Sequence, residues 1–226
     1  MRQGLSTCGA QLTENPMTQA QFWNTRYENA GEDYVFGTEP NRFLAHRAAL
    51  LASGSTAIAI ADGEGRNSVW LAAQGLKVTA VEFAPAALRK ARKLAAGRGV
   101  QVDFIEADIL AADWPPAEMR AAFDWVVAIF VQFTNPQERE RQFAAMKALT
   151  KPGGCILLQG YTPKQLDYKT GGPSAVENLY TPALLQELFA DWQIEELVEY
   201  EDEIDEGPGH KGKSALIGLV ARKPED

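Results

Sequence analysis

The chain has 226 residues, 46% of them hydrophobic, which is enough to bury the core of a single α/β domain. Its 22 Lys and Arg residues are outnumbered by 30 Asp and Glu residues. The resulting net charge of −8 would repel a phosphate backbone, so we expect no nucleic-acid partner. No apolar run approaches the roughly 20 residues that cross a bilayer, so we expect no membrane span.

The two cysteines, Cys8 and Cys155, are too few for a disulfide framework and are not a close pair that could hold zinc. With only two histidines, no metal site is predicted. The first residues lack the charged and apolar stretches of a secretory signal, and we expect a cytoplasmic protein. Residues 1–16 are rich in Gln, Thr and Gly without a period, which predicts disorder.

From Ser55 onward, apolar runs of strand length alternate with segments of helical period, which indicates a parallel sheet wrapped by helices. In chain order we predict a strand at 56–61, a helix at 65–74, a strand at 77–82, a helix at 85–97 and strands at 100–105 and 123–129. A helix at 136–149 and a strand at 155–159 complete this core, with a turn at 151–154.

The last part of the chain reads differently. Thr181 and Pro182 are typical of a helix cap and first turn. Strand-like runs at 192–200 and 214–221 flank a Gly-Pro-Gly turn, so we predict an antiparallel hairpin at the sheet edge. The whole chain is expected to form one domain.

The loop after the first predicted strand reads Ala-Asp-Gly-Glu-Gly-Arg-Asn over residues 61–67. In open α/β sheets, ligands bind beyond the carboxyl ends of the strands. Gly63 and Gly65 let a ligand approach the backbone, and the free amides that open the next helix favour a carboxylate. The alternative is that this sequence forms a structural turn that binds no ligand.

Acidic residues follow the next two strands. Glu82 closes the second strand, where a carboxylate can accept hydrogen bonds from both hydroxyls of a ribose. Asp108 lies just past the third strand, where its side chain could meet an adenine amino group. Either residue could instead be a solvent-facing acid.

Taken together, these features resemble the class I S-adenosylmethionine (SAM)-dependent methyltransferases, and among them the small bacterial tellurite-resistance and thiopurine methyltransferases. The resemblance runs from about Gln21 to the C-terminus. It rests on AIAIADGEGRNSVWLA from Ala57, VTAVEFAPAALRKA from Val78, FIEADI from Phe104, FDWVVAIF from Phe123 and LTKPGG from Leu149.

The resemblance implies a Rossmann-like, doubly wound α/β fold whose seven-stranded sheet has the order 3-2-1-4-5-7-6, its last strand antiparallel and helices on both faces. It implies SAM as cofactor, with S-adenosylhomocysteine (SAH) as product, in a monomer or homodimer. Residues 17–54 would form a helical lid and residues 55–226 the SAM-binding core. The implied cofactor-binding residues are Asp62, Gly63, Gly65, Asn67, Glu82, Phe83, Asp108, Ile109, Ile129, Trp23 and Phe36.

The sequence departs from the family pattern at Ala59, Ala61 and Asp62, where an acid, a glycine and often a cysteine are usual. Asp62 could meet the SAM ammonium or could cap the following helix. In the lid, Trp23, Tyr27, Tyr34 and Phe36 are candidate walls of the site, or they could simply pack the lid on the sheet.

No residue can be named as a catalytic base from the sequence. The candidates near an acceptor are Tyr161, Gln132, Tyr180 and His210, and His210 is favoured because histidine titrates near neutrality. A surface-loop histidine without a role is the alternative. The loop at 162–178 has the length and glycine content of a lid over a substrate.

The resemblance favours methyl transfer to a small molecule, and a soft sulfur, selenium or tellurium nucleophile is the acceptor class that it suggests. Alternatives are an oxygen or nitrogen acceptor, or a non-catalytic SAM-binding protein. A dehydrogenase is disfavoured because the full Gly-x-Gly-x-x-Gly is missing. A DNA methylase is disfavoured because Ile-Phe-Val-Gln, residues 129–132, stands where Asn-Pro-Pro-Tyr is usual.

Overall fold

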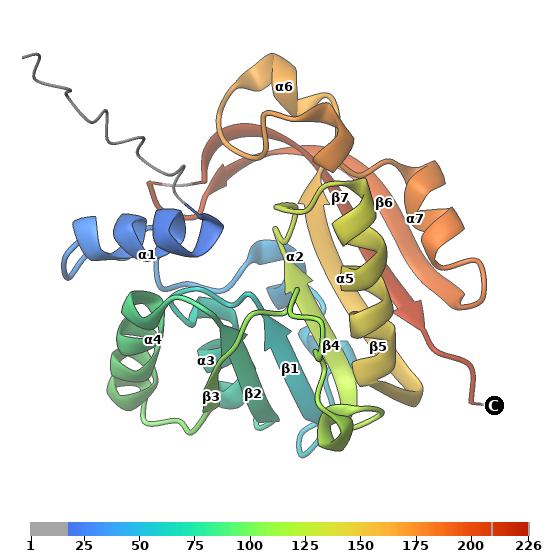
Figure 1. Ribbon diagram of the computed structural model, residues 1–226, viewed down its shortest axis with the longest axis horizontal. Coiled ribbons are helices and arrows are strands. Elements are labelled where there is room, and N and C mark those ends of the chain that lie inside the picture. Colours follow the sequence, from blue (N-terminus) through green and yellow to red (C-terminus); the bar gives the residue numbers. More distant parts are fainter. Residues whose placement is uncertain (1–17, 209, 226) are drawn as a thin grey trace, which may run out of the picture.

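Seven strands form one mixed sheet at the centre of the molecule (Figure 1). The computed structural model describes residues 18–208 and 210–225, so the disorder predicted for residues 1–16 lies outside the described residues. The strands are β1 (Thr56–Ile60), β2 (Lys77–Glu82), β3 (Asp103–Glu106), β4 (Phe123–Ile129), β5 (Thr150–Tyr161), β6 (Gln193–Asp205) and β7 (Lys211–Arg222). Their order is β3-β2-β1-β4-β5-β7-β6. Because β7 runs antiparallel to both of its neighbours, the predicted topology is confirmed.

Helices cover both faces of this sheet (Figure 1). The α-helices are α1 (Gln19–Asn29), α2 (Arg42–Ala45), α3 (Arg66–Ala73), α4 (Pro85–Arg98), α5 (Pro136–Leu149), α6 (Gln165–Tyr168) and α7 (Pro182–Leu188). One core layer packs α5 and α7 on the sheet, and a second packs α2 and α3 on the opposite face. The doubly wound arrangement is therefore the predicted one.

The two core layers follow from the alternation of side chains along the central strands. In β1, Ile58 and Ile60 face α5, whereas Ala57 faces α3. In β4, Val126 and Val127 likewise point to opposite faces. Both faces of these strands are covered, which explains why their sequences are continuously apolar.

Local signals placed several helix boundaries correctly. The side chain of Asn135 accepts from the backbone N–H of Glu138, and α5 begins at Pro136 as predicted. Thr181 caps α7 in the same way through the backbone N–H of Leu184.

Other boundaries differ for identifiable reasons. Helix α4 continues through Gly97 and ends at Arg98, because Gly99 is the residue with a left-handed backbone, φ 67°. Val100 donates to the carbonyl of Ala95 and closes the helix, which delays β3 to Asp103. Strand β1 ends one residue early because Ala61 has a φ of 47°. Strand β5 takes in the turn predicted at 151–154, and the hairpin strands are longer than predicted.

Replacing Gly218 by alanine is expected to destabilise the sheet. A Cβ at Gly218 would lie 2.0 Å from Cε2 of the buried Phe43 ring, so the ring must move and about 1–3 kcal/mol of stability should be lost. Gly97 is the matched control, since a Cβ there meets nothing within 4 Å and alanine should stabilise α4 by up to about 1 kcal/mol. Urea unfolding of both variants measures the difference, and equal stabilities would contradict the packing described.

Candidate functional site

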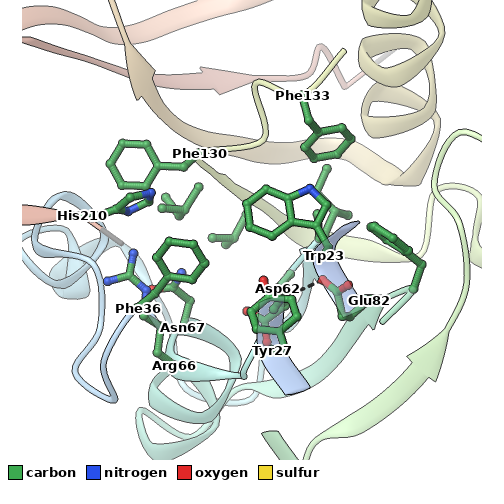
Figure 2. Close-up of a pocket in the computed structure, with 17 residues that line it drawn as sticks. Trp23, Tyr27, Phe36, Asp62, Arg66, Asn67, Glu82, Phe130, Phe133 and His210 are labelled. Carbon is green, nitrogen blue, oxygen red and sulfur yellow. Dashed lines mark hydrogen bonds between the residues drawn. The ribbon is translucent and has the colours of Figure 1, made fainter. Parts of the chain in front are cut away.

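A cavity lies where β1, β2 and β4 end, beside the point at which the strand order reverses (Figure 2). We call it the central cavity. It is lined by Trp23, Tyr27, Phe36, Ala59, Ile60, Ala61, Asp62, Gly63, Arg66, Asn67, Glu82, Phe83, Val127, Ile129, Phe130, Phe133 and His210. This is the place at which the open-sheet rule predicts a ligand.

Two further cavities adjoin the central cavity. An outer cavity of about 540 Å³ shares Trp23, Phe36, Phe130, Phe133 and His210 with it. A side cavity shares Phe83 and Phe133 and includes Asp108 and Ile109. The three cavities therefore adjoin, and together they could hold an elongated ligand with a second molecule beside it.

Both glycines of the turn have backbone conformations that residues with a side chain rarely adopt. Gly63 has a φ of 62° and lines the central cavity, and a Cβ there would lie 2.9 Å from the Tyr27 hydroxyl. Gly65 has a φ of 88°, caps α3 and lies against α4, where a Cβ would be 2.7 Å from that of Ala91. Gly65 does not line the central cavity, so its place in the structure is that of a packing glycine.

Asp62 lies at the mouth of the turn and bonds to α3. Its carboxylate accepts from the backbone N–H of Ser68 at 3.3 Å and from the Ser68 hydroxyl. The capping contact considered for Asp62 is therefore present. Desolvation raises the pKa of Asp62 to about 7, against the hydrogen bonds from Ser68, which lower it.

The raised pKa of Asp62 predicts a pH dependence of stability. The folded protein keeps this proton up to about pH 7 and the unfolded chain releases it near the ordinary value, so the contribution is full below about pH 4 and is lost as the pH rises to about 7. Asp62→Asn removes this titration. We expect the difference in unfolding free energy between wild type and variant to slope over that window and to be flat above it, as measured by urea unfolding. A difference that does not change with pH would contradict the raised pKa.

Glu82 is 4% exposed and its carboxylate reaches the central cavity. One oxygen accepts from the backbone N–H of Gly63 and the other from that of Ala84, both at 2.9 Å. Burial raises its pKa, although the backbone hydrogen bonds lower it. Glu82 thus joins the ends of β1 and β2 and presents acceptor oxygens to a ligand.

Asp108 and Ile109 lie apart from the central cavity, on the side cavity. Asp108 is exposed and accepts from the backbone N–H of Leu110 at 2.8 Å. Ile109 is buried. Phe83 stands between the two cavities, so a ligand bound to Glu82 could extend past its ring toward Asp108.

Three of the four lid aromatics gather over the cavity. The Trp23 ring stacks on Tyr27 at 5.9 Å and lies 6.2 Å from Phe36, and all three line the cavity. Helix α1 is tied across the site because the Asn24 side chain accepts from the first turn of α4 and Gln19 donates to the Phe133 carbonyl. Tyr34 lies elsewhere and donates to the Lys90 carbonyl, so it is not a wall of the cavity.

His210 lies in the turn between β6 and β7, where it is half-buried and lines the site. Its ring lies 4.5 Å from that of Phe36 and 4.4 Å from that of Phe130, and it lines both the central and the outer cavity (Figure 2). Burial, with the charges of Arg66 and Arg26, lowers the pKa of His210 to about 3. A neutral imidazole of this kind is a weak base near pH 7.

The other three catalytic candidates have structural contacts. The Gln132 amide donates to the carbonyls of Tyr161 and Asn178 and accepts from the backbone N–H of Tyr161, which joins β4 to β5. Tyr161 lines the outer cavity, and burial raises the pKa of its hydroxyl. Tyr180 is fully buried against Phe143 and lines neither the central nor the outer cavity.

A buried polar network beside the cavity has no counterpart in the predictions. Arg66 pairs with Glu206 through Nη2 and Oε2 at 2.7 Å, with side chains 7% and 5% exposed. Asn41 donates to Glu206 at 2.9 Å. The Nη1 of Arg66 is buried and has no hydrogen-bond partner among the described residues, and Arg66 lines the central cavity (Figure 2).

Phe130 was also missed. Its φ of 56° is unusual for a residue with a side chain, and it directs the ring between the central and outer cavities, 4.7 Å from Tyr161. Backbone strain of about 1–3 kcal/mol is typical of binding sites. Positive φ after a strand leaves no signal in a single sequence.

Residues 57–154 match a family model described as a methyltransferase domain. The matched stretch is less than half of the chain, and over that range the chain is similar to methyltransferase domains. The matched range includes the glycine turn, Glu82 and Asp108. Gly63 of the turn and Glu82 line the central cavity. The match to a methyltransferase domain agrees with the SAM cofactor that the sequence resemblance implies.

Individual relatives are similar to this chain either in sequence or in fold. A demethylmenaquinone methyltransferase of Thermus thermophilus is 35% identical over 91 residues, which cover 40% of this chain and 39% of that protein. A structure titled for the conversion of a disulfide bond into a thioacetal group during echinomycin biosynthesis has a TM-score of 0.75 at 17% identity, covering 92% and 93% of the chains.

TehB from Haemophilus influenzae has a TM-score of 0.62 at 21% identity, covering 80% of this chain and 61% of that one. At these identities the two solved structures establish the fold alone. The likeness to TehB therefore gives only weak support to the resemblance to tellurite-resistance enzymes.

In the part of the chain that the structure describes, none of the helices combines the length and the apolar character needed to span a bilayer. The cytoplasmic location and the monomeric or homodimeric state stay predictions.

Proposed function

We propose that this chain transfers a methyl group from SAM to a small-molecule acceptor. The observation that carries the proposal is the adjoining pair of cavities at the ends of β1, β2 and β4, one beside Glu82 and the glycine turn and the other lined by aromatic rings. The methyl donor would occupy the first and the acceptor the second.

The residues of the central cavity suit the parts of SAM. Glu82 would accept from the ribose hydroxyls, Phe83 would pack on the adenine, and Ile129 would form the floor. Asp108 and Ile109 would meet the adenine in the side cavity. These assignments follow the resemblance and the positions of the side chains.

The methionine end of SAM has a partner that the resemblance did not supply. Leaving a buried charged donor without an acceptor is costly, by about 1–3 kcal/mol or more. The Nη1 of Arg66 has no hydrogen-bond partner among the described residues, and Arg66 lines the central cavity together with Gly63 and Asn67, so a carboxylate that reached Nη1 from the cavity would supply the missing acceptor. We assign the SAM carboxylate to this position.

SAM supplies a sulfonium methyl that is already activated, so the protein has to orient the acceptor and exclude water. The aromatic faces of Trp23, Tyr27 and Phe36 would stabilise the sulfonium by cation-π attraction of about 0.5–2 kcal/mol and keep the site dry. The acceptor in the outer cavity would then face the methyl group.

The soft-nucleophile proposal draws support from the weakness of the available bases. No Asp or Glu of the described residues lines the outer cavity, and the pKa of His210 is lowered to about 3. An acceptor that is already deprotonated, such as a thiolate or a selenium or tellurium oxyanion, needs no base. Oxygen or nitrogen acceptors with a proton to lose are the second candidates.

Calorimetric titration of the protein with SAM, SAH and NAD tests the cofactor assignment. We expect SAM and SAH to bind with micromolar dissociation constants and NAD not to bind. A screen of thiol, selenium and tellurium acceptors, with oxygen and nitrogen acceptors beside them, would follow by SAH release. No binding of SAM or SAH would refute the proposal. Binding without turnover of any acceptor would favour the non-catalytic alternative that the unusual Ala59 and Ala61 keep open.

A further inference from the structure

The outer cavity has the volume and the walls of a site for an aromatic ring. Its volume of about 540 Å³ falls in the range of small-molecule sites. Aromatic rings from three separate segments surround it, namely Trp23, Phe36, Phe130, Phe133 and Tyr161. Aromatic walls favour stacked or edge-on contacts with another ring.

The charge of this cavity is positive. The Arg26 guanidinium lies 5.2 Å from the ring centroids of Trp23 and Phe36, so it is held over the aromatic wall. Among the described residues, no carboxylate lines the outer cavity to balance it. A cation held in this way attracts an anionic ligand, and it does so more strongly once water is excluded.

His210 adds a hydrogen-bonding group at the boundary with the central cavity. Its Nδ1 is buried and has no hydrogen-bond partner among the described residues. The backbone of His210 is held in place, because the backbone N–H of Glu206 donates to the His210 carbonyl and the backbone N–H of His210 donates to the Gly207 carbonyl. Gly207 itself packs tightly on the lid, since a Cβ there would lie 2.4 Å from the Gly37 nitrogen.

We propose that the acceptor is a flat aromatic anion whose ring lies between the aromatic walls and whose negative group is bound by Arg26 and by Nδ1 of His210. The inference rests on the proposed function, because it places this anion beside the methyl donor. Nδ1 donates in the tautomer that carries its proton there, and an anion between the two groups would satisfy a donor that is otherwise buried without a partner.

A matched pair of unreactive probes tests the charge of the acceptor. The full chain is saturated with SAH and titrated in a calorimeter with 2-naphthoate and with its neutral isostere 2-naphthamide. We expect the carboxylate to bind about tenfold or more tightly than the amide, as a charge-assisted hydrogen bond predicts. Equal affinities, or no binding of the naphthoate to the SAH complex, would overturn the inference.

Variants then assign the preference to residues. Arg26→Gln should bring the affinities for the two probes to within about threefold of one another. The SAH affinity of this variant should stay within about threefold of the wild-type value. His210→Phe retains the ring packing on Phe36 and Phe130 but removes Nδ1, and it should also reduce the preference for the carboxylate. Arg89→Gln, an exposed site on α4 outside the cavities, should leave the ratio unchanged.

The result separates two failures. If SAH does not bind the wild-type chain, the proposed function is wrong and the probes say nothing of the acceptor. If SAH binds and the probes do not differ, or if Arg26→Gln keeps the full preference, the acceptor class alone is wrong.

Discussion

Replacing Glu206 by alanine is expected to lower the unfolding free energy by about 3–5 kcal/mol. The change leaves the Arg66 guanidinium, 7% exposed, without its ion-pair partner, and it also removes an acceptor from Asn41. A buried charge without a partner costs far more than the pair contributed. Urea unfolding at neutral pH measures the loss.

Glu203→Ala is the matched control for this prediction. Glu203 lies on the same hairpin strand with an exposed side chain, so its removal should change stability by less than about 0.5 kcal/mol. If Glu206→Ala cost less than about 1 kcal/mol, water would have to reach Arg66, and the buried network described here would be wrong.

Glu82→Ala should weaken SAH binding at least tenfold, because it deletes a charged acceptor proposed to meet the ribose, and such hydrogen bonds contribute about 1.5–3 kcal/mol. Asp108→Ala should weaken it as well, and less, since Asp108 is exposed at the side cavity. Calorimetry with SAH gives both dissociation constants. Unchanged affinity in both variants would refute the site assignment.

Two further variants of the chain control for indirect effects in that experiment. Asp103→Ala removes an exposed carboxylate at the start of β3, outside the three cavities, and should leave the affinity unchanged. Glu82→Gln retains the side-chain shape and one carbonyl acceptor for Gly63 or Ala84. A loss of affinity in Glu82→Gln at unchanged thermal stability would identify the ligand contact and exclude collapse of the turn.

What the sequence predicted well depends on local or periodic signals. The apolar run of β4, the alternation of strands and helices and the cap at Asn135 each fix their element through neighbours in the chain, and the sheet followed from them. The position of Glu82 beside the glycine turn could be expected because a carboxylate after the second strand has a fixed place relative to that turn, and its role in binding stays a prediction. For such residues, the spacing in the sequence is enough to predict their position in the fold.

What the sequence did not predict depends on contacts between distant residues. Arg66 and Glu206 are 140 positions apart, and neither belongs to a spacing that would reveal the pair. A surface-loop histidine without a role was one of the two interpretations of His210, yet Gly207 packs on the lid and the His210 ring lies 4.5 Å from that of Phe36. Tertiary contacts of this kind override the local reading of a turn.

The two walls of the central cavity come from opposite ends of the described chain, Trp23 from α1 and His210 from the hairpin. During synthesis, sheet strands β1 to β5 can pair before β7 exists. The aromatic rings of α1 and of the strand ends therefore stay uncovered on the ribosome until the hairpin emerges. The central cavity therefore acquires its full lining only after the hairpin has joined the sheet, and a ligand bound there would report that β7 is paired.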